Sequence, residues 1–169
     1  PRNTIRFCIA VRNKANGFDS NHHLAGNDWY NNSAYQNGTN FNMVNRRSPE
    51  SDDIWVNGYD HVLKNNLSYQ SSLGLKHTAY MDTSKNIQQY NSFDLPVTVS
   101  SDDFVSIDKD QLTAPRKADG SLPDIDFMRP AAGSDIIDAG IDIGFSYVGH
   151  APDLGAIEFH PTTSIADAR

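Results

Sequence analysis

The sequence predicts an all-β solenoid, in which short strands stack rung upon rung, and two internal repeats support this fold class. A shift of 24 residues places three residues on identical ones: Ala10 on Ala34, Asn13 on Asn37 and Asn16 on Asn40. A shift of 34 residues does the same for four more: Asn31 on Asn65, Asn32 on Asn66, Tyr35 on Tyr69 and Gln36 on Gln70. Repeats of about 20–30 residues with short strands and polar turns are typical of solenoids.

Asparagine usage is the third observation behind this prediction. Fourteen of the 16 asparagines fall in residues 1–66. Asparagine tolerates the left-handed backbone of tight turns, and its side-chain amide can stack on an identical residue one rung away. This distribution therefore favours a coil with repeated corners over a polar, loop-rich surface.

Residues 1–99 are predicted to form the rungs of the coil. The first strand candidates, each flanked by Asn, Gly or Asp, are Thr4–Val11, Gly17–Phe18, Asp28–Tyr30 and Phe41–Val44. The later rungs are expected at residues 61–69, more weakly at 76–86, and as a further strand at Pro96–Val99.

The repeat is interrupted at residues 45–58. This stretch is polar and contains Pro49, so we expect a loop that leaves the coil and returns to it, anchored by Trp55. Its acidic residues Glu50, Asp52 and Asp53 do not match the spacing of an EF-hand calcium loop, and we interpret them as solvated.

Residues 100–160 differ in composition and are predicted to be an irregular segment of the same domain that caps the last rung. No asparagine follows Asn91, and six of the eight prolines lie at or beyond Pro96. Residues 101–104 are typical of a helix N-terminus, and residues 153–159 are predicted as a final strand. Four aspartates are expected to form caps and turns: Asp135, Asp138, Asp142 and Asp153. Residues 161–169 are predicted to be a frayed tail.

Charge and composition exclude several classes of protein. With 14 basic and 21 acidic residues the net charge is −7, and the basic residues are scattered, which argues against nucleic acid as a partner. No run approaches the roughly 18 apolar residues of a membrane span, so we expect no membrane partner. The single cysteine, Cys8, excludes an internal disulfide, and its strand-like neighbours predict a small buried side chain.

The N-terminus leads directly into strand-like residues, without an initiator methionine or a signal sequence. A solenoid needs a cap over its first rung, and no candidate for one precedes residue 4. We therefore expect this chain to be the C-terminal part of a longer protein.

Two groups of motifs resemble a known family. The first is Asn-Gly-Phe-Asp-Ser-Asn at 16–21, followed by Tyr-Asn-Asn-Ser-Ala-Tyr-Gln-Asn-Gly at 30–38. It resembles the later rungs of family 9 polysaccharide lyases, which are pectate lyase-like and rhamnogalacturonan lyase-like enzymes. The second is Ser-Asp-Ile-Ile-Asp-Ala-Gly at 134–140 and Ala-Pro-Asp-Leu-Gly-Ala-Ile-Glu at 151–158, which is similar to the closing segment of that family. The resemblance covers about residues 3–160 and implies a right-handed parallel β-helix.

The resemblance also implies calcium-assisted β-elimination on a uronic-acid polymer. In such lyases the calcium-binding aspartates and the catalytic lysine come from rungs before the Gly-Phe-Asp rung, so we expect no catalytic residue and no metal ligand in this chain. Lys14 is not taken as the base, because the internal repeat aligns it with Gly38. The implied partners are an acidic plant-type polysaccharide or oligosaccharide and the missing N-terminal part of the protein. The implied location is secreted, periplasmic or cell-surface.

Six residues are candidates for substrate binding. Asp19, Asn21, His22 and His23 form the densest polar group on the rung that should adjoin the catalytic one, although a structural corner is the preferred interpretation of Asp19. Arg46 and Arg47 in the inserted loop are candidates to bind sugar carboxylates. Adjacent histidines on an extended chain point to opposite sides, so His22 and His23 are not expected to share a metal ion.

Two alternatives remain open at this stage. One is a β-helix that binds glycan without chemistry, and the other is a β-helix hydrolase or epimerase that uses paired carboxylates. The sequence also leaves open whether the polymer is homogalacturonan or rhamnogalacturonan, and whether cleavage is internal or terminal.

Overall fold

A computed structural model describes residues 1–52, 55–71, 74 and 76–161 of the 169-residue chain. Its ten strands are β1 (Thr4–Arg6), β2 (Ile9–Val11), β3 (Asn16–Asp19), β4 (Asp28–Tyr30), β5 (Ser33–Asn37), β6 (Thr39–Asn42), β7 (Val62–Lys64), β8 (Leu67–Ser71), β9 (Thr78–Ala79) and β10 (Ile87–Gln89). The two short 3₁₀ helices are η1 (Ser101–Asp103) and η2 (Lys109–Thr113).

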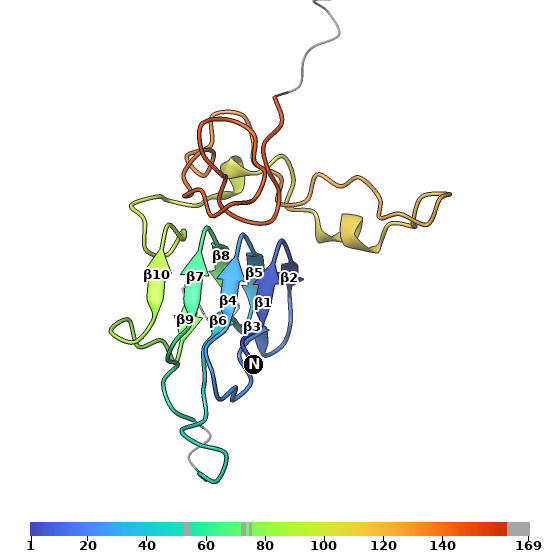
Figure 1. The fold of residues 1–169 in the computed structure, drawn as a ribbon. Helices are drawn as coiled ribbons and strands as arrows, with labels where there is room; N and C mark the ends of the chain where they lie inside the picture. Colours follow the sequence, from blue (N-terminus) through green and yellow to red (C-terminus); the bar gives the residue numbers. More distant parts are fainter. Residues whose placement is uncertain (53–54, 72–73, 75, 162–169) are drawn as a thin grey trace, which may run out of the picture.

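The strands form three parallel sheets that run along the coil (Figure 1). Their orders are β1-β4-β7-β10, β2-β5-β8 and β3-β6-β9, so each rung contributes one strand to each sheet. Three rungs are complete, and β10 begins a fourth. The predicted parallel β-helix is confirmed.

The strand registers follow the internal repeat in the first two sheets. Ala10 pairs with Ala34, and Tyr35 pairs with Tyr69, as the shifts of 24 and 34 predict. The third sheet departs from the prediction, because Asn16 pairs with Thr39 rather than with Asn40. Between equivalent positions, the corner from β5 to β6 in the second rung is one residue shorter than the corner from β2 to β3 in the first rung.

Each rung turns its first corner with a residue in the left-handed region. The equivalent residues are Phe7 (φ 52°), Asn31 (φ 48°), Asn65 (φ 57°) and Tyr90 (φ 58°). Asparagine accepts this backbone at lower cost than most residues, which explains two of the four positions. The corner at Phe7 also corrects the prediction of one strand over Thr4–Val11, since it divides that stretch into β1 and β2.

An asparagine ladder follows this corner along the coil. The backbone N–H and side-chain amide of Asn32 both donate to Asn66 Oδ1, at 3.1 and 3.0 Å, and Asn66 donates in the same way to Asn91 Oδ1, at 2.9 and 2.8 Å. Cys8 occupies the first position of the ladder, where its N–H donates to Asn32 Oδ1. The prediction that Cys8 is buried is wrong: its thiol lies at the exposed end of the coil and donates to the backbone oxygen of Arg6.

Apolar side chains fill two cores. The first lies inside the coil and consists of Phe18, Trp29, Ala34, Phe41, Met43 and Leu63. The second lies where residues 100–160, which we call the closing segment, pack against β5 and β8. It consists of Tyr35, Leu67, Tyr69, Phe104, Phe127, Met128, Ile136 and Leu154. Aromatic residues one rung apart stack in both, with ring centroids 5.0 Å apart for Phe18 and Phe41 and 5.5 Å apart for Tyr35 and Tyr69.

The closing segment is held by carboxylate caps. The predicted helix start is confirmed as η1, where Ser100 Oγ and the Asp103 carboxylate form a reciprocal capping box. Asp138 Oδ1 accepts from the backbone N–H groups of His150 and Ala151, at 2.7 and 3.0 Å. The buried carboxylate of Asp153 accepts from the backbone N–H of Asp138 at 2.8 Å.

Two strand predictions near this segment are wrong. Residues 96–99 pair with no strand, because Val97 and Val99 turn toward the second core instead. Residues 153–159 curl around the Asp153 carboxylate, which accepts from the N–H of Phe159, and Gly155 has φ 101°.

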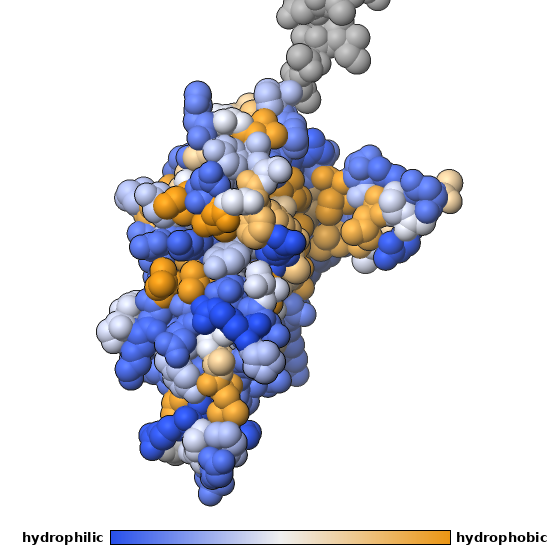
Figure 2. Space-filling model, in the orientation of Figure 1, coloured by the Kyte–Doolittle hydropathy of each residue, from blue (hydrophilic) through white to orange (hydrophobic). Residues whose placement is uncertain are grey.

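The segment between β6 and β7 projects from the coil away from the closing segment (Figure 1). The visible face of the molecule is largely hydrophilic, with apolar residues in separate patches (Figure 2). Within the described residues, neither helix has the length and apolar composition needed to cross a bilayer.

Candidate functional site

The turn after β3 presents the polar group that the sequence analysis singled out. Asn21 and His22 both have left-handed backbones, with φ 49° and 59°. The turn is fixed against the next rung, because the N–H of His22 donates to Val44 O at 3.1 Å and Ser20 Oγ donates to the same oxygen at 2.5 Å. The chain is thus held in a conformation that turns several side chains outward.

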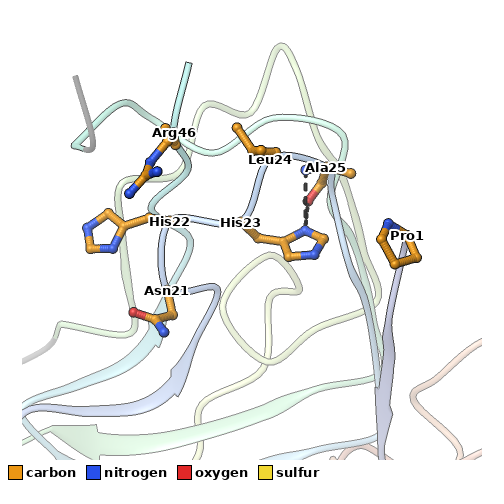
Figure 3. Close-up of a pocket in the computed structure, with 7 residues that line it drawn as sticks. All are labelled: Pro1, Asn21, His22, His23, Leu24, Ala25 and Arg46. Carbon is orange, nitrogen blue, oxygen red and sulfur yellow. Dashed lines mark hydrogen bonds between the residues drawn. The ribbon is translucent and has the colours of Figure 1, made fainter. Parts of the chain in front are cut away.

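A hollow of about 560 Å³ lies beside this turn (Figure 3). It is lined by Pro1, Asn21, His22, His23, Leu24, Ala25 and Arg46, and we call it the His22 hollow. The structure therefore brings together four of the six predicted site residues. Its volume falls within the range of about 300–1,000 Å³ that is usual for small-ligand sites.

Two nitrogen atoms in the His22 hollow have no hydrogen-bond partner among the described residues. They are Nε2 of His22 and Nε of Arg46, and both atoms are buried. In Figure 3 the guanidinium group of Arg46 points toward the imidazole ring of His22. An unsatisfied buried polar atom costs about 1–3 kcal/mol.

His23 is held more firmly than His22. Its Nδ1 is hydrogen-bonded to the backbone oxygen of Ala25, and its Nε2 lies 3.4 Å from Nδ2 of Asn3. Both histidines line the same hollow, but their rings point to opposite sides of the chain, as expected, with His22 on the side of Arg46 and His23 on the side of Pro1 (Figure 3). Within the described part of the chain, no group of three or more His, Cys, Asp or Glu side chains could hold a metal ion.

The other two predicted site residues lie elsewhere. Asp19 uses both carboxylate oxygens locally, since Oδ1 accepts from the N–H of Asn21 at 2.7 Å and Oδ2 accepts from Nδ2 of Asn16 at 2.5 Å. This geometry favours the structural interpretation of Asp19. Arg47 lines a second hollow of about 490 Å³, which we call the Arg47 hollow, together with Trp55, Val56, Asn57, Tyr59, Asp82 and Lys85.

The inserted loop is anchored by Tyr59, which the sequence analysis did not select. Oη of Tyr59 lies 3.0 Å from Leu24 O and 2.5 Å from Arg46 O, so it ties the loop to the His22 hollow. Trp55, the predicted anchor, is 60% exposed and contacts His22 at its edge. No pattern in the sequence distinguishes Tyr59 from the other tyrosines, because its role depends on the path of the loop. Of the acidic residues in the loop, Glu50 is exposed and Asp53 lies outside the described residues.

The buried residue His61 is connected to the His22 hollow through its hydrogen bond to Asn45. Nδ1 of His61 accepts from the N–H of Asn27 at 3.0 Å and from Nε1 of Trp29 at 3.3 Å, and its Nε2 bonds to Oδ1 of Asn45 at 2.6 Å. Burial lowers the pKa of His61 from 6.5 to about 4, so the ring is neutral at pH 7. Asn45 directly precedes Arg46, and the network therefore connects the interior of the coil to the His22 hollow.

The closing segment contains a pair of carboxylates that is structural. Burial raises the pKa of Asp153, and burial together with the nearby Asp153 charge raises the pKa of Glu158. Asp153 is fully buried, however, and Glu158 accepts from the N–H groups of Val148 and Asp153. This pair holds the segment together and is not open to a sugar chain.

Comparison with known proteins places this fold among the parallel β-helix lyases. The chain resembles pectate lyase Pel9A with a TM-score of 0.77 and 33% identity, over 93% of this chain and 36% of that one. It resembles a rhamnogalacturonan lyase with a TM-score of 0.71 and 39% identity, over 76% of this chain and 30% of that one. No family model matches the sequence.

The curated proteins that the sequence matches are also pectate lyases. The chain is 33% identical over 151 residues to pectate lyase L of Dickeya dadantii (strain 3937), which covers 89% of this chain and 32% of that protein. It is 29% identical over 143 residues to pectate lyase L of Paenibacillus polymyxa (strain SC2), and this match covers 83% of this chain and 28% of that protein. The chain thus spans about a third of the length of these relatives. The resemblance to family 9 polysaccharide lyases is confirmed: the chain is a homologue of pectate lyases and has a pectate lyase-like fold.

Proposed function

We propose that this chain is the C-terminal part of a polysaccharide lyase that cleaves a uronic-acid-containing pectic polysaccharide by calcium-assisted β-elimination. The observation that supports the proposal is the joint match of sequence and fold to pectate lyases over most of the chain. The His22 hollow, which is lined by Arg46, adds a positively charged group that suits an acidic sugar.

In the proposed reaction a base removes the C5 proton beside the sugar carboxylate. The C5–H electrons form the C4–C5 double bond, the C4–O bond breaks, and the 4-linked sugar leaves as an alcohol after protonation. A metal ion or a basic side chain at the carboxylate stabilises the negative charge that develops there. The proposal assigns the calcium ion and the base to the length of the relatives that this chain does not match, since the match covers 32% of pectate lyase L of Dickeya dadantii.

The role assigned to this chain is to bind the polymer beside the catalytic rung. A guanidinium group can pair with a carboxylate through two parallel N–H···O bonds. Arg46 supplies such a group in the His22 hollow, where His22 and Asn21 add polar contacts for hydroxyl groups. Since a substrate of this kind lies outside the cytoplasm, we also propose that the protein is secreted, periplasmic or displayed at the cell surface.

The test is an elimination assay that follows the ultraviolet absorbance of the unsaturated product. Polygalacturonate and rhamnogalacturonan are each incubated with calcium and either this chain or the longer protein that the proposal requires. We expect activity only in the longer protein, abolished by a chelator. Activity of the 169-residue chain would contradict the placement of the base, and binding without elimination in both would favour a glycan-binding β-helix.

A matched pair of substitutions tests the role of Arg46 in the longer protein. We expect Arg46→Gln to raise KM at least about tenfold, because a hydrogen bond to a charged group is worth about 1.5–3 kcal/mol. Arg116→Gln is the control, since Arg116 is exposed in the closing segment. Equal KM values for the two variants would remove Arg46 from the binding surface.

A further inference from the structure

A third hollow, of about 510 Å³, lies where β8 of the coil meets the residues that lead into η1. Like the His22 hollow, it has a volume in the usual range for small-ligand sites. We call it the His77 hollow, and it is lined by Ser68, Tyr69, Gln70, His77, Ser92, Val97, Thr98, Val99, Ser100 and Ser101.

A chain of hydrogen bonds fixes the imidazole ring of His77. Oδ1 of Asn40 accepts from the N–H of Asn37 at 3.3 Å and its Nδ2 donates to Gln70 O at 2.7 Å, so backbone groups set the orientation of this amide. Nδ2 of Asn40 also donates to Ser68 Oγ at 2.8 Å, and Ser68 Oγ lies 2.8 Å from Nδ1 of His77. Among the residues that the structure describes, Nδ1 is the only acceptor within reach of the Ser68 hydroxyl hydrogen. The proton of the neutral ring therefore lies on Nε2.

His77 thus brings one donor of fixed position to the hollow. Burial lowers the pKa of His77, which keeps the ring neutral at pH 7. Within the described part of the chain no other group bonds to the ring, so the Nε2–H is available to a ligand. Ser68 is only 2% exposed, so its hydroxyl cannot reach a substrate as a nucleophile. We interpret the serine as the group that orients the histidine.

The charges around the His77 hollow disfavour an anion. Its lining side chains are hydroxyl, amide, aromatic and aliphatic groups and the neutral imidazole. Two carboxylates bond to lining residues from outside the hollow: Asp103 accepts from Ser100 Oγ at 3.1 Å, and Asp135 accepts from the N–H of Thr98 at 3.4 Å. Lys76, the neighbour of His77 in sequence, does not line the hollow. The His22 hollow differs in this respect, because an arginine lines it.

We propose that the His77 hollow is a subsite for an uncharged sugar unit. In this subsite a sugar oxygen accepts from the Nε2–H of His77, and the apolar C–H face of the sugar packs on Val97 and Val99. The choice of a sugar rests on the function proposed above, whereas the choice of an uncharged one rests on the charges around the hollow. The protein would then bind the acidic and the neutral units of a polysaccharide in different hollows.

Calorimetry on the 169-residue chain tests the proposal with two ligands of the same length. They are trigalacturonate and its carboxyl-reduced form, which is a neutral trisaccharide. His77→Phe is expected to bind the neutral ligand about 2- to 10-fold more weakly, which is the value of one neutral hydrogen bond, and to bind trigalacturonate unchanged. His77→Gln, whose side-chain Nε2 can replace the ring donor, is expected to recover part of the affinity.

Two further variants and one spectroscopic measurement complete the test. Ser101→Trp, at an exposed lining position, is expected to block the neutral ligand without a change at His77. His150→Phe is the matched control, since His150 is exposed in the closing segment. Circular dichroism verifies that each variant is folded, and Ser101→Trp decides the test where His77→Phe is not. In ¹H–¹⁵N spectra we expect a protonated Nε2 and an unprotonated Nδ1 in His77, with a shift of Nε2 when the neutral ligand is added.

The outcomes separate this proposal from the proposed function. Absence of binding by the neutral trisaccharide would overturn the subsite, as would equal affinity of folded His77→Phe and the unchanged chain. A proton on Nδ1 of His77 would also overturn it. A lyase-active longer protein without His77-dependent binding would overturn the subsite and leave the lyase function intact. His77-dependent binding of the neutral ligand, without elimination by the longer protein, would support the subsite and overturn the lyase function.

Discussion

The neutral state of His61 makes the stability of this protein sensitive to acid. Protonating Nδ1 would place a positive charge in the core and set a donor against the N–H groups of Asn27 and Trp29. In the unfolded chain the ring is free to take up a proton near pH 6.5, whereas in the folded protein its pKa lies at about 4. Between these values the unfolded state binds more protons, so stability falls as the pH falls.

The magnitude follows from the two pKa values. The loss is about 1.4 kcal/mol per pH unit across the window, and the difference of roughly 2.5 units gives about 3.5 kcal/mol in total, complete below pH 4. Burial also lowers the pKa of His77, which adds to the loss in the same direction. Above pH 6.5 the contribution of His61 to stability is constant.

Urea denaturation at half-unit steps from pH 4 to pH 7.5 measures this dependence. His61→Gln is expected to be less stable throughout, because its hydrogen bonds to Asn27, Trp29 and Asn45 are altered, and its stability is expected to fall less steeply with acid. His150→Gln, at an exposed position, is expected to keep the slope of the unchanged protein. Parallel slopes for the His61 variant and the unchanged protein would refute the assignment, as would an imidazole of His61 that titrates near 6.5 by NMR.

Three further predictions concern the coil. Asn66→Ala is expected to lower the free energy of unfolding by about 2–4 kcal/mol, since it leaves buried ladder groups unpaired, whereas Gln70→Ala on the exposed side of the same rung is expected to cost less than about 1 kcal/mol. Phe41→Ala is expected to cost about 3–5 kcal/mol by urea denaturation, with the exposed Phe7→Ala as the control. The outer edges of β1, β2 and β3 predict self-association of the isolated chain, and a monomer by light scattering at high concentration would contradict this.

The repeat made the coil predictable because its spacing is imposed by geometry. Between two given rungs, residues that stack share one interval, and the interval of 34 that aligns Tyr35 with Tyr69 and Asn32 with Asn66 in the sequence also pairs them in the structure. The same logic failed where a corner changes its length, as between β5 and β6. It also failed for Cys8, which shares its ladder position with buried asparagines but lies at the exposed end of the coil.

The strand predictions at residues 96–99 and 153–159 failed for a different reason. Alternating apolar residues at Val97 and Val99 have the period of a strand, yet burial of those side chains against the second core satisfies the same pattern without pairing. At residues 153–159 the Asp153 carboxylate takes the backbone N–H of Phe159 that a neighbouring strand would otherwise engage.

The site itself arises where the chain departs from its repeat. The interval between equivalent residues is 24 from β1 to β4 and 34 from β4 to β7, so the second rung carries ten additional residues. Those residues bring Arg46 and Trp55 against His22, which belongs to the preceding rung. A regular rung would present only a stacked corner at this point. Candidate binding residues in a solenoid are therefore best sought at insertions and in the turns they contact, where side chains are free of the stacking that the coil requires.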